Sequence, residues 1–378
     1  MSDESVDRQE ELKSRALELI ERDLELWRSN NGDGKEAQRE MLLCRKQESL
    51  ERAKPWLVAN EDRLLRYFAD GAEIDPNAIT PEIEFCETQL QHDLFRYARL
   101  HWSMPYSDYV GRRYRILVRD SSLVQRPIIG IAALGSALWA LKPRDDEIGW
   151  NRETREDRLP FVMDVFVLGA MPPYNHILGG KLVALLVSSN QVREYHRSRY
   201  ANRPTVIRKR VVNDLVLLVT TSLFGKNTSL YNRLRYNGEL LYHYCGETSG
   251  QGTIHFTDET VEAIREFLSS TGISISHRFG KGPNWRIRLI RTGLEQLKLD
   301  AKQLLKHGQT RGVFLIPMAS NAFEFLRGET DDIEYCDRPV DRLIDYWKRR
   351  WLRKRIQRPE IMRAFRSHTH ESLRILQE

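Results

Sequence analysis

The chain has 378 residues, 41% of them hydrophobic, so it can bury a full core and is long enough for two or three structural units. Its 59 Lys and Arg against 53 Asp and Glu give a formal net charge of +6, which mildly favours an anionic partner such as nucleic acid. Four widely spaced cysteines form no CxxC or Cys/His cluster, and no apolar run reaches the roughly 20 residues of a membrane span. These features argue against a zinc site, a disulfide framework and membrane insertion, and they predict a cytoplasmic protein.

Helical periodicity dominates the first hundred residues. Between residues 12 and 27 apolar side chains recur at helical spacing, and the polar run NNGDG at 30–34 then signals a turn. Further helices are predicted up to about residue 105, interrupted by a loop over 72–82. We therefore expect residues 1–104 to form a helical N-terminal region.

Strand patterns begin near residue 110. Two runs at 112–120 and 126–134 predict a β-hairpin. A buried strand at 164–170 leads through a turn into a helix, and another apolar strand follows at 211–223. With further short strands up to residue 256, this part is predicted to be a mixed α/β core over 105–257.

Helices return from residue 258, with one short strand predicted at 311–317 and a basic helical tail from residue 346. The expected fold class is therefore α+β. A mixed sheet with its helices occupies the middle of the chain, and the helical parts 1–104 and 258–378 flank it.

The turn between the buried strand and the following helix carries two adjacent glycines and a lysine, Gly179, Gly180 and Lys181. A helix start offers unpaired N–H groups and a positive dipole end, and glycine lets a phosphate approach them closely. The turn is thus a candidate pyrophosphate site, to which Asn175 just upstream is added. Neither GxxxxGK[ST] nor GxGxxG is present. The alternative is that the glycines only allow tight packing of helix on strand.

The order of elements around this turn is specific: a strand, the glycine-bearing helix, a second strand, then Tyr231 on a short helix. This order resembles the core of the GNAT acyltransferases. The resemblance implies that the helix start binds the pyrophosphate of coenzyme A and that Tyr231 protonates the leaving thiolate, a role open to a phenol held near the sulfur. Only the first glycine of the GNAT motif is matched at His176–Lys181, so the ligand is coenzyme A or another phosphate-bearing molecule.

A wider resemblance covers residues 94 to 358. It is carried most specifically by the runs RDDEIGWN at 144–151 and YNHILGGKL at 174–182. These segments are similar to the DruA family of the Druantia anti-phage system. The resemblance implies a bacterial defence or mobile-element setting, with other defence-system proteins as possible partners, and it implies no particular reaction.

Three acidic or titratable features could serve a reaction. The cluster Asp145–Glu147 could bind a divalent metal or supply a general base, or it could be a capped, solvated loop. Asp164 begins an otherwise apolar strand, so its carboxylate must be paired, for example with an arginine, or serve a site. His176 in the central turn is a candidate base or a structural histidine. We keep Tyr231, Asp164 and His176 as catalytic candidates and predict no metal ligands.

Two basic stretches are candidates for contact with nucleic acid. Arginine binds phosphates and aromatic rings stack on bases, and both stretches interleave Lys or Arg with Tyr or Trp. Neither has a comparable acidic run beside it in the sequence, which favours nucleic acid over a merely solvated face. The candidate residues are Arg193, Arg197, Arg199, Arg208, Lys209 and Arg210 in the first stretch, and Lys348, Arg349, Arg350 and Arg353 in the second.

The sequence therefore favours a DruA-like defence component that engages nucleic acid, with a GNAT-like cleft as an active site or a remodelled binding site. One alternative is an acyltransferase that uses coenzyme A on a nucleobase or a protein amine. Another is a non-catalytic subunit that recruits other proteins, or a DNA-handling protein of a mobile element.

Overall fold

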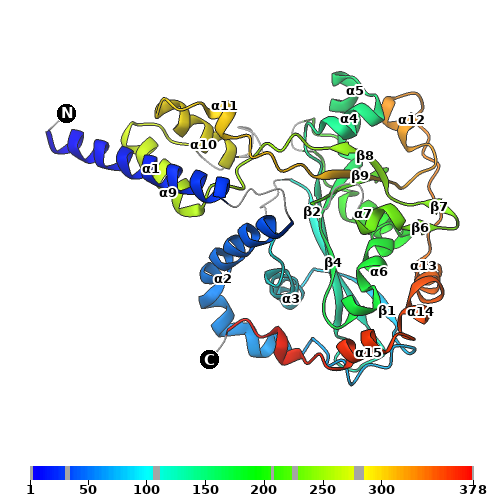
Figure 1. Ribbon diagram of the computed structural model, residues 1–378. Coiled ribbons are helices and arrows are strands. Elements are labelled where there is room, and N and C mark those ends of the chain that lie inside the picture. The colour runs from blue at the N-terminus through cyan, green and yellow to red at the C-terminus, as the bar shows by residue number, and fades with distance from the viewer. Residues whose placement is uncertain are drawn as a thin grey trace. The chain divides into compact units, whose positions relative to one another are not determined.

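The computed structural model describes residues 3–29, 35–104, 111–205, 208–223, 229–275 and 285–376. The chain divides into two compact units (Figure 1). One consists of Met1–Glu51, Ser103–Val110 and Ser249–Thr310, and the other of Arg52–Trp102, Gly111–Thr248 and Arg311–Glu378. Among the described residues, no helix combines the length and apolar character needed to cross a bilayer.

The larger unit is built on a seven-stranded mixed sheet, so the predicted α+β class is confirmed. The sheet takes one strand from before residue 104 and one from after residue 257, and the expected three-part division of the chain stays a prediction. In spatial order the strands are β1 (Pro81–Phe85), β2 (Arg113–Asp120), β3 (Ile128–Ser136), β4 (Val162–Ala170), β5 (Leu217–Ser222), β9 (Gly312–Pro317) and β8 (His243–Glu247).

One pair of neighbouring strands in this sheet is parallel. β4 and β5 pair only over Val162–Asp164 and Leu217–Val219, whereas every other neighbouring pair is antiparallel. The register of β4 against β3 also shifts between Val165 and Val167, which places a bulge in β4 just beyond the parallel ladder. The second half of β4 thus leaves the ladder with β5 and leads to the glycine turn.

Helices cover both faces of the sheet. The apolar helix α6 packs on β3 and β4 with α7 and α13 on the same face, and α4 and α12 pack on the other face at β5 and β9 (Figure 1). This unit contains α3 (Gln89–Leu100), α4 (Lys142–Ile148), α5 (Arg152–Arg158), α6 (Gly179–Leu186), α7 (Asn190–Tyr200), α12 (Ala322–Arg327), α13 (Val340–Trp347), α14 (Arg353–Arg355) and α15 (Pro359–Arg366). It also contains the short helices η1 (Leu159–Phe161), η2 (Tyr174–Ile177), η3 (Leu230–Arg233), η4 (Lys348–Leu352) and η5 (His370–Leu373), and the small pair β6 (Arg235–Tyr236) and β7 (Glu239–Leu240).

The smaller unit is helical. Its core joins Ala16 and Ile20 of one helix to Ile264 and Phe267 of another. Asp23 is 2% exposed and accepts a hydrogen bond from the backbone N–H of Thr257 at 2.6 Å, at the start of the second helix. The helices are α1 (Asp3–Ser29), the first part of α2 (Lys35–Leu65), α9 (Asp258–Ser270), α10 (Trp285–Gln296) and α11 (Ala301–Leu304).

Candidate nucleic-acid interface

The glycine turn connects β4 to α6, as the sequence predicts. Leu178 adopts a left-handed conformation with φ of 66°, and α6 begins at Gly179. A Cβ atom on Gly179 would lie 2.8 Å from the carbonyl oxygen of Tyr174, whereas one on Gly180 would meet no atom within 4 Å. Gly179 therefore serves close packing, and Gly180 faces open space. Asn175 lies exposed in the same turn.

The basic tail folds back onto this turn. The indole Nε1 of Trp347 donates to the carbonyl oxygen of Leu178 at 3.1 Å, and Nε of Arg355 donates to the carbonyl oxygen of His176 at 2.9 Å. Burial and the Arg355 charge together lower the pKa of His176. Two regions that the sequence singled out separately therefore form one surface.

Lys181 gathers a group of cations at this meeting point, which we call the Lys181 cluster: Lys181, Arg233, Arg350 and Arg355. The ammonium of Lys181 lies 4.6 Å from the ring centre of Trp351. Burial lowers the pKa of Lys181, and the three arginines lower it further, with no carboxylate among the causes. Such a site favours an anion. The sequence does not single out Arg233 as a candidate, although its position two residues after Tyr231 could have indicated it.

The tail has one apolar and one cationic side. Leu343, Trp347, Leu352 and Phe365 are buried in the main core, and η4 between α13 and α14 is a π-helical turn. Residues 340–366 contain ten Lys or Arg and three Asp or Glu, and none of the ten forms an ion pair with the part of the chain that the structure describes. We call these ten the tail surface: Arg342, Lys348, Arg349, Arg350, Arg353, Lys354, Arg355, Arg358, Arg363 and Arg366.

The first basic stretch differs, because several of its cations are neutralised. Arg197 pairs with Asp214 at 2.6 Å, Arg210 pairs with Asp157 at 3.0 Å, and Arg208 also pairs with Asp157. The expectation that no acidic residues offset this stretch is therefore wrong. Asp157 lies 51 residues before Arg208, and Asp214 lies 17 residues after Arg197. Folding brings both acids to the arginines.

The remaining candidates of this stretch have separate surroundings. Arg193 lies 4.3 Å from the ring centre of Tyr335 and donates to the carbonyl oxygen of Cys336 at 3.1 Å. Lys209 is exposed. Arg199 donates to the hydroxyl of Tyr195 at 2.8 Å and lines a pocket on α7. Their binding of nucleic acid stays a prediction.

Tyr231 is enclosed in the core. Its ring stacks on Tyr242 with centres 4.7 Å apart and an interplanar angle of 3°, and it packs edge-on against Phe314. Burial raises the pKa of Tyr231 to about 12, opposed by a hydrogen bond with Thr220. The phenol therefore stays protonated at neutral pH, as a general acid requires, but Tyr231 as a whole residue is only 8% exposed.

Asp164 lies in β4 at the end of the parallel ladder. Its Oδ2 accepts the backbone N–H of Leu138 at 3.0 Å, whereas Oδ1 is buried and has no hydrogen-bond partner. Burial raises the pKa of Asp164 to about 7, and the Arg144 charge opposes this rise. The position of Asp164 is thus compatible with both alternatives: pairing with an arginine, or service in a site.

The acidic cluster predicted as a loop is helix α4, and it serves the fold. Asp145 is held by the fully buried Arg144 at 2.7 Å and by Arg155 at 3.2 Å, and it accepts the indole N–H of Trp150 at 3.1 Å. Among the described residues, no group of three or more His, Cys, Asp or Glu is arranged to hold a metal ion.

These features define a protein with a mixed sheet, a glycine turn beside several cations and a basic tail whose cations form no ion pair with the described residues. A family model described as "Druantia protein DruA" matches residues 32–328. The curated Druantia protein DruA of Escherichia coli (strain UMEA 4076-1) is 35% identical over 306 residues, covering 79% of this chain and 75% of that protein. The chain therefore belongs to the DruA family, and the resemblance inferred from the sequence is confirmed. No solved structure matches the chain.

Proposed function

We propose that this DruA-family chain is a component of bacterial anti-phage defence and binds nucleic acid through the tail surface. The family and its relative's name support the defence setting. The observation that carries the binding proposal is the set of ten tail cations with no ion pair among the described residues. We expect the chain to act with other proteins of a Druantia system.

A solvated face is a poorer explanation of the tail. Solvated helices usually mix both signs of charge, because like charges held close together repel one another and destabilise the folded state. Here Leu343, Trp347 and Leu352 are buried and hold the helix on the core, so the backbone keeps the attachment points of the cations close together. A polyanion relieves the repulsion, and its bound counterions are released.

The Lys181 cluster extends the tail surface to the glycine turn. A phosphate there would meet Lys181 and Arg350 and the open space beside Gly180. Phosphate contacts carry no sequence information, so we expect little preference among sequences.

The test compares two variants with the same change in charge. In the tail variant, Arg349, Arg350, Arg353 and Lys354 are replaced by alanine. We expect affinity for labelled single-stranded DNA or RNA to fall roughly 100-fold at about 50 mM salt, and the log–log salt slope to fall by about three units. Fluorescence anisotropy at several salt concentrations measures both quantities.

The matched control replaces four cations of α1, Arg8, Lys13, Arg15 and Arg28, by alanine. It should change affinity by less than about threefold. Equal losses in both variants would show that only net charge matters. Absence of binding by the wild type at low salt would overturn the proposal and favour a subunit that recruits proteins.

One observation favours a second function, an acyltransferase. β4, α6, β5 and η3 follow in the order expected of a GNAT-like core, and the β4–β5 ladder ends at Asp164 while β4 continues to Ala170 before the turn into α6. Coenzyme A would place its pyrophosphate at Gly180 and Lys181, and Tyr231 or Asp164 would transfer a proton. Native mass spectrometry of the purified chain tests this: bound coenzyme A supports an enzyme, and no binding of added acetyl-coenzyme A at about 1 mM rejects it.

A further inference from the structure

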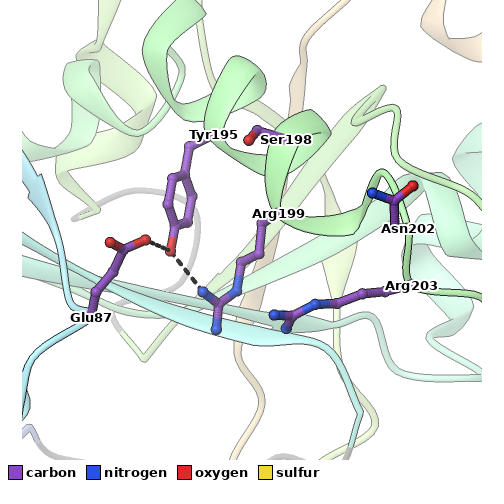
Figure 2. Close-up of a pocket in the computed structure, with 6 residues that line it drawn as sticks. All are labelled: Glu87, Tyr195, Ser198, Arg199, Asn202 and Arg203. Carbon is purple, nitrogen blue, oxygen red and sulfur yellow. Dashed lines mark hydrogen bonds between the residues drawn. The ribbon is translucent and has the colours of Figure 1, made fainter.

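A separate open pocket of about 310 Å³ lies on the outer face of α7 (Figure 2). It combines one residue from the turn after β1 with residues from the last turns of α7 and the loop that follows. The lining residues are Glu87, Tyr195, Ser198, Arg199, Asn202 and Arg203.

Tyr195 organises one wall of this pocket. Its ring stacks on Phe85 with centres 3.6 Å apart and an interplanar angle of 4°. Its hydroxyl donates to the carboxylate of Glu87 at 3.3 Å and accepts from Arg199 at 2.8 Å (Figure 2). Because the stack holds the ring, the carboxylate and the guanidinium are held at fixed positions before any ligand arrives.

A second, cationic wall continues from Arg199 to Arg203 and is open. The guanidinium groups of Arg199 and Arg203 point toward the same region of the pocket (Figure 2), and in the described chain Arg203 and Asn202 have no side-chain partner. Two guanidinium groups side by side without a carboxylate between them match the oxygens of a phosphate.

Polar groups behind this wall are also unsatisfied. Nε of Arg199, the hydroxyl of Tyr114 and both ring nitrogens of His196 are buried without hydrogen-bond partners, and His196 is 0% exposed. The rings of Tyr114 and His196 lie 6.0 Å apart, and Tyr114 lies 5.3 Å from Tyr195. Buried polar groups in folded proteins are nearly always satisfied, so water is expected beside Tyr114 and His196, which lie outside the pocket lining, whereas Nε of Arg199 belongs to a lining residue.

We propose that this pocket binds a single nucleotide, with its phosphate between Arg199 and Arg203 and a base or ribose donor group on Glu87. A bare anion would gain nothing from a nearby carboxylate, which repels it. A ligand with a phosphate at one end and N–H or O–H donors at the other satisfies both walls. The site lies on α7, involves none of the tail cations, and goes beyond the proposed function.

Isothermal titration calorimetry of the full chain with AMP, CMP, GMP, UMP and inorganic phosphate tests the proposal. At least one nucleotide should bind more tightly than phosphate. Arg203→Ala should weaken nucleotides and phosphate alike, by roughly tenfold or more, because it removes a charge-assisted contact. Glu87→Gln should have opposite effects: phosphate binds more tightly and the preferred nucleotide more weakly.

Arg8→Ala removes an exposed arginine of the other compact unit and should leave nucleotide binding unchanged. The nucleotide should also bind the tail variant normally, which separates this site from the proposed nucleic-acid surface. The proposal is overturned if no nucleotide binds at about 10 mM, if Arg203→Ala binds as the wild type does, or if Glu87→Gln strengthens nucleotides and phosphate equally, since that outcome describes a simple anion site.

Discussion

Two basic stretches that look alike in the sequence differ in how far acidic residues pair with them in the folded protein. Both interleave arginines with aromatic rings, yet Arg197, Arg208 and Arg210 of the first are paired with acids, whereas the tail cations have no ion pair among the described residues. A run of cations therefore says little about binding until its acidic neighbours in space are known. Pairing at such exposed sites contributes little stability, typically up to about 1 kcal/mol. It nevertheless leaves the paired arginines less available to an anionic ligand.

The largest effect is expected for a buried cation whose hydrogen bonds hold the fold together. Arg144 is 0% exposed and donates to Asp145 at 2.7 Å and to the carbonyl oxygen of Leu138 at 2.8 Å. Arg144→Met should lower the free energy of unfolding by about 3 to 5 kcal/mol, because it leaves a carboxylate and a carbonyl without this partner. Urea denaturation measures the loss.

The matched change in the tail is Arg350→Met. It should alter the free energy of unfolding by less than about 0.5 kcal/mol, since Arg350 is exposed and forms no ion pair among the described residues. If both substitutions destabilise the protein equally, Arg350 contributes to the fold as a buried cation does, and the tail surface is not free to bind a ligand.

A buried acid extends the comparison to negative charge. The pKa of Asp164 is raised to about 7 in the folded state from 3.8, so between these pH values the folded state binds more protons than the unfolded one. Asp164 should therefore lower the stability of the protein progressively as pH rises from 4 to 7. Asp164→Asn removes this penalty and should be more stable than the wild type above pH 7, by up to roughly 4 kcal/mol.

Chemical denaturation at several pH values between 4 and 8 measures this difference. An exposed carboxylate provides the control: for Asp146→Asn the difference from the wild type should stay small over the whole range. A difference for Asp164→Asn that does not change with pH would contradict the assigned titration.

The smallest effect is expected from a substitution that removes an acid from the first basic stretch, so that part of this stretch resembles the tail. Asp157→Asn removes the acid that Arg208 and Arg210 share, while Arg208 keeps its ion pair with Glu156 at 3.3 Å. We expect affinity for single-stranded nucleic acid to rise about threefold, since roughly one additional phosphate contact, from Arg210, becomes available. Glu10→Gln on α1 changes the net charge equally, and an equal gain from it would assign the effect to net charge alone.

Much of the fold could be predicted because it follows from local patterns. The β2–β3 hairpin, β4, α6 and β9 all lie where alternation or helical periodicity places them. β1 was missed, since Pro81–Phe85 is short and follows turn residues, and it becomes a strand by pairing with β2. The last of the short strands predicted up to residue 256 is wrong: residues 252–256 form bends and turns, and Phe256 is buried among helices.

The candidate site could be predicted only in pieces. The glycine turn and the tail each carry a local signal, but their contact at Leu178 and Trp347 joins residues far apart in the chain. The ion pairs of Arg208 and Arg210 depend on α5 in the same way. Glu87 gave no signal at all, because one acid in a turn becomes part of a pocket only when α7 packs beside it.

The π-helical turn of the tail sets the direction in which its charges point. An α-helix rotates about 100° per residue, so five residues would carry Leu352 roughly 140° away from Trp347. The wider turn over Lys348–Leu352 absorbs this mismatch, and both side chains stay buried. Deleting one residue within it would shift the phase of everything that follows and turn cations toward the core. The number of residues in this turn, and not only their charge, thus determines which way the tail faces.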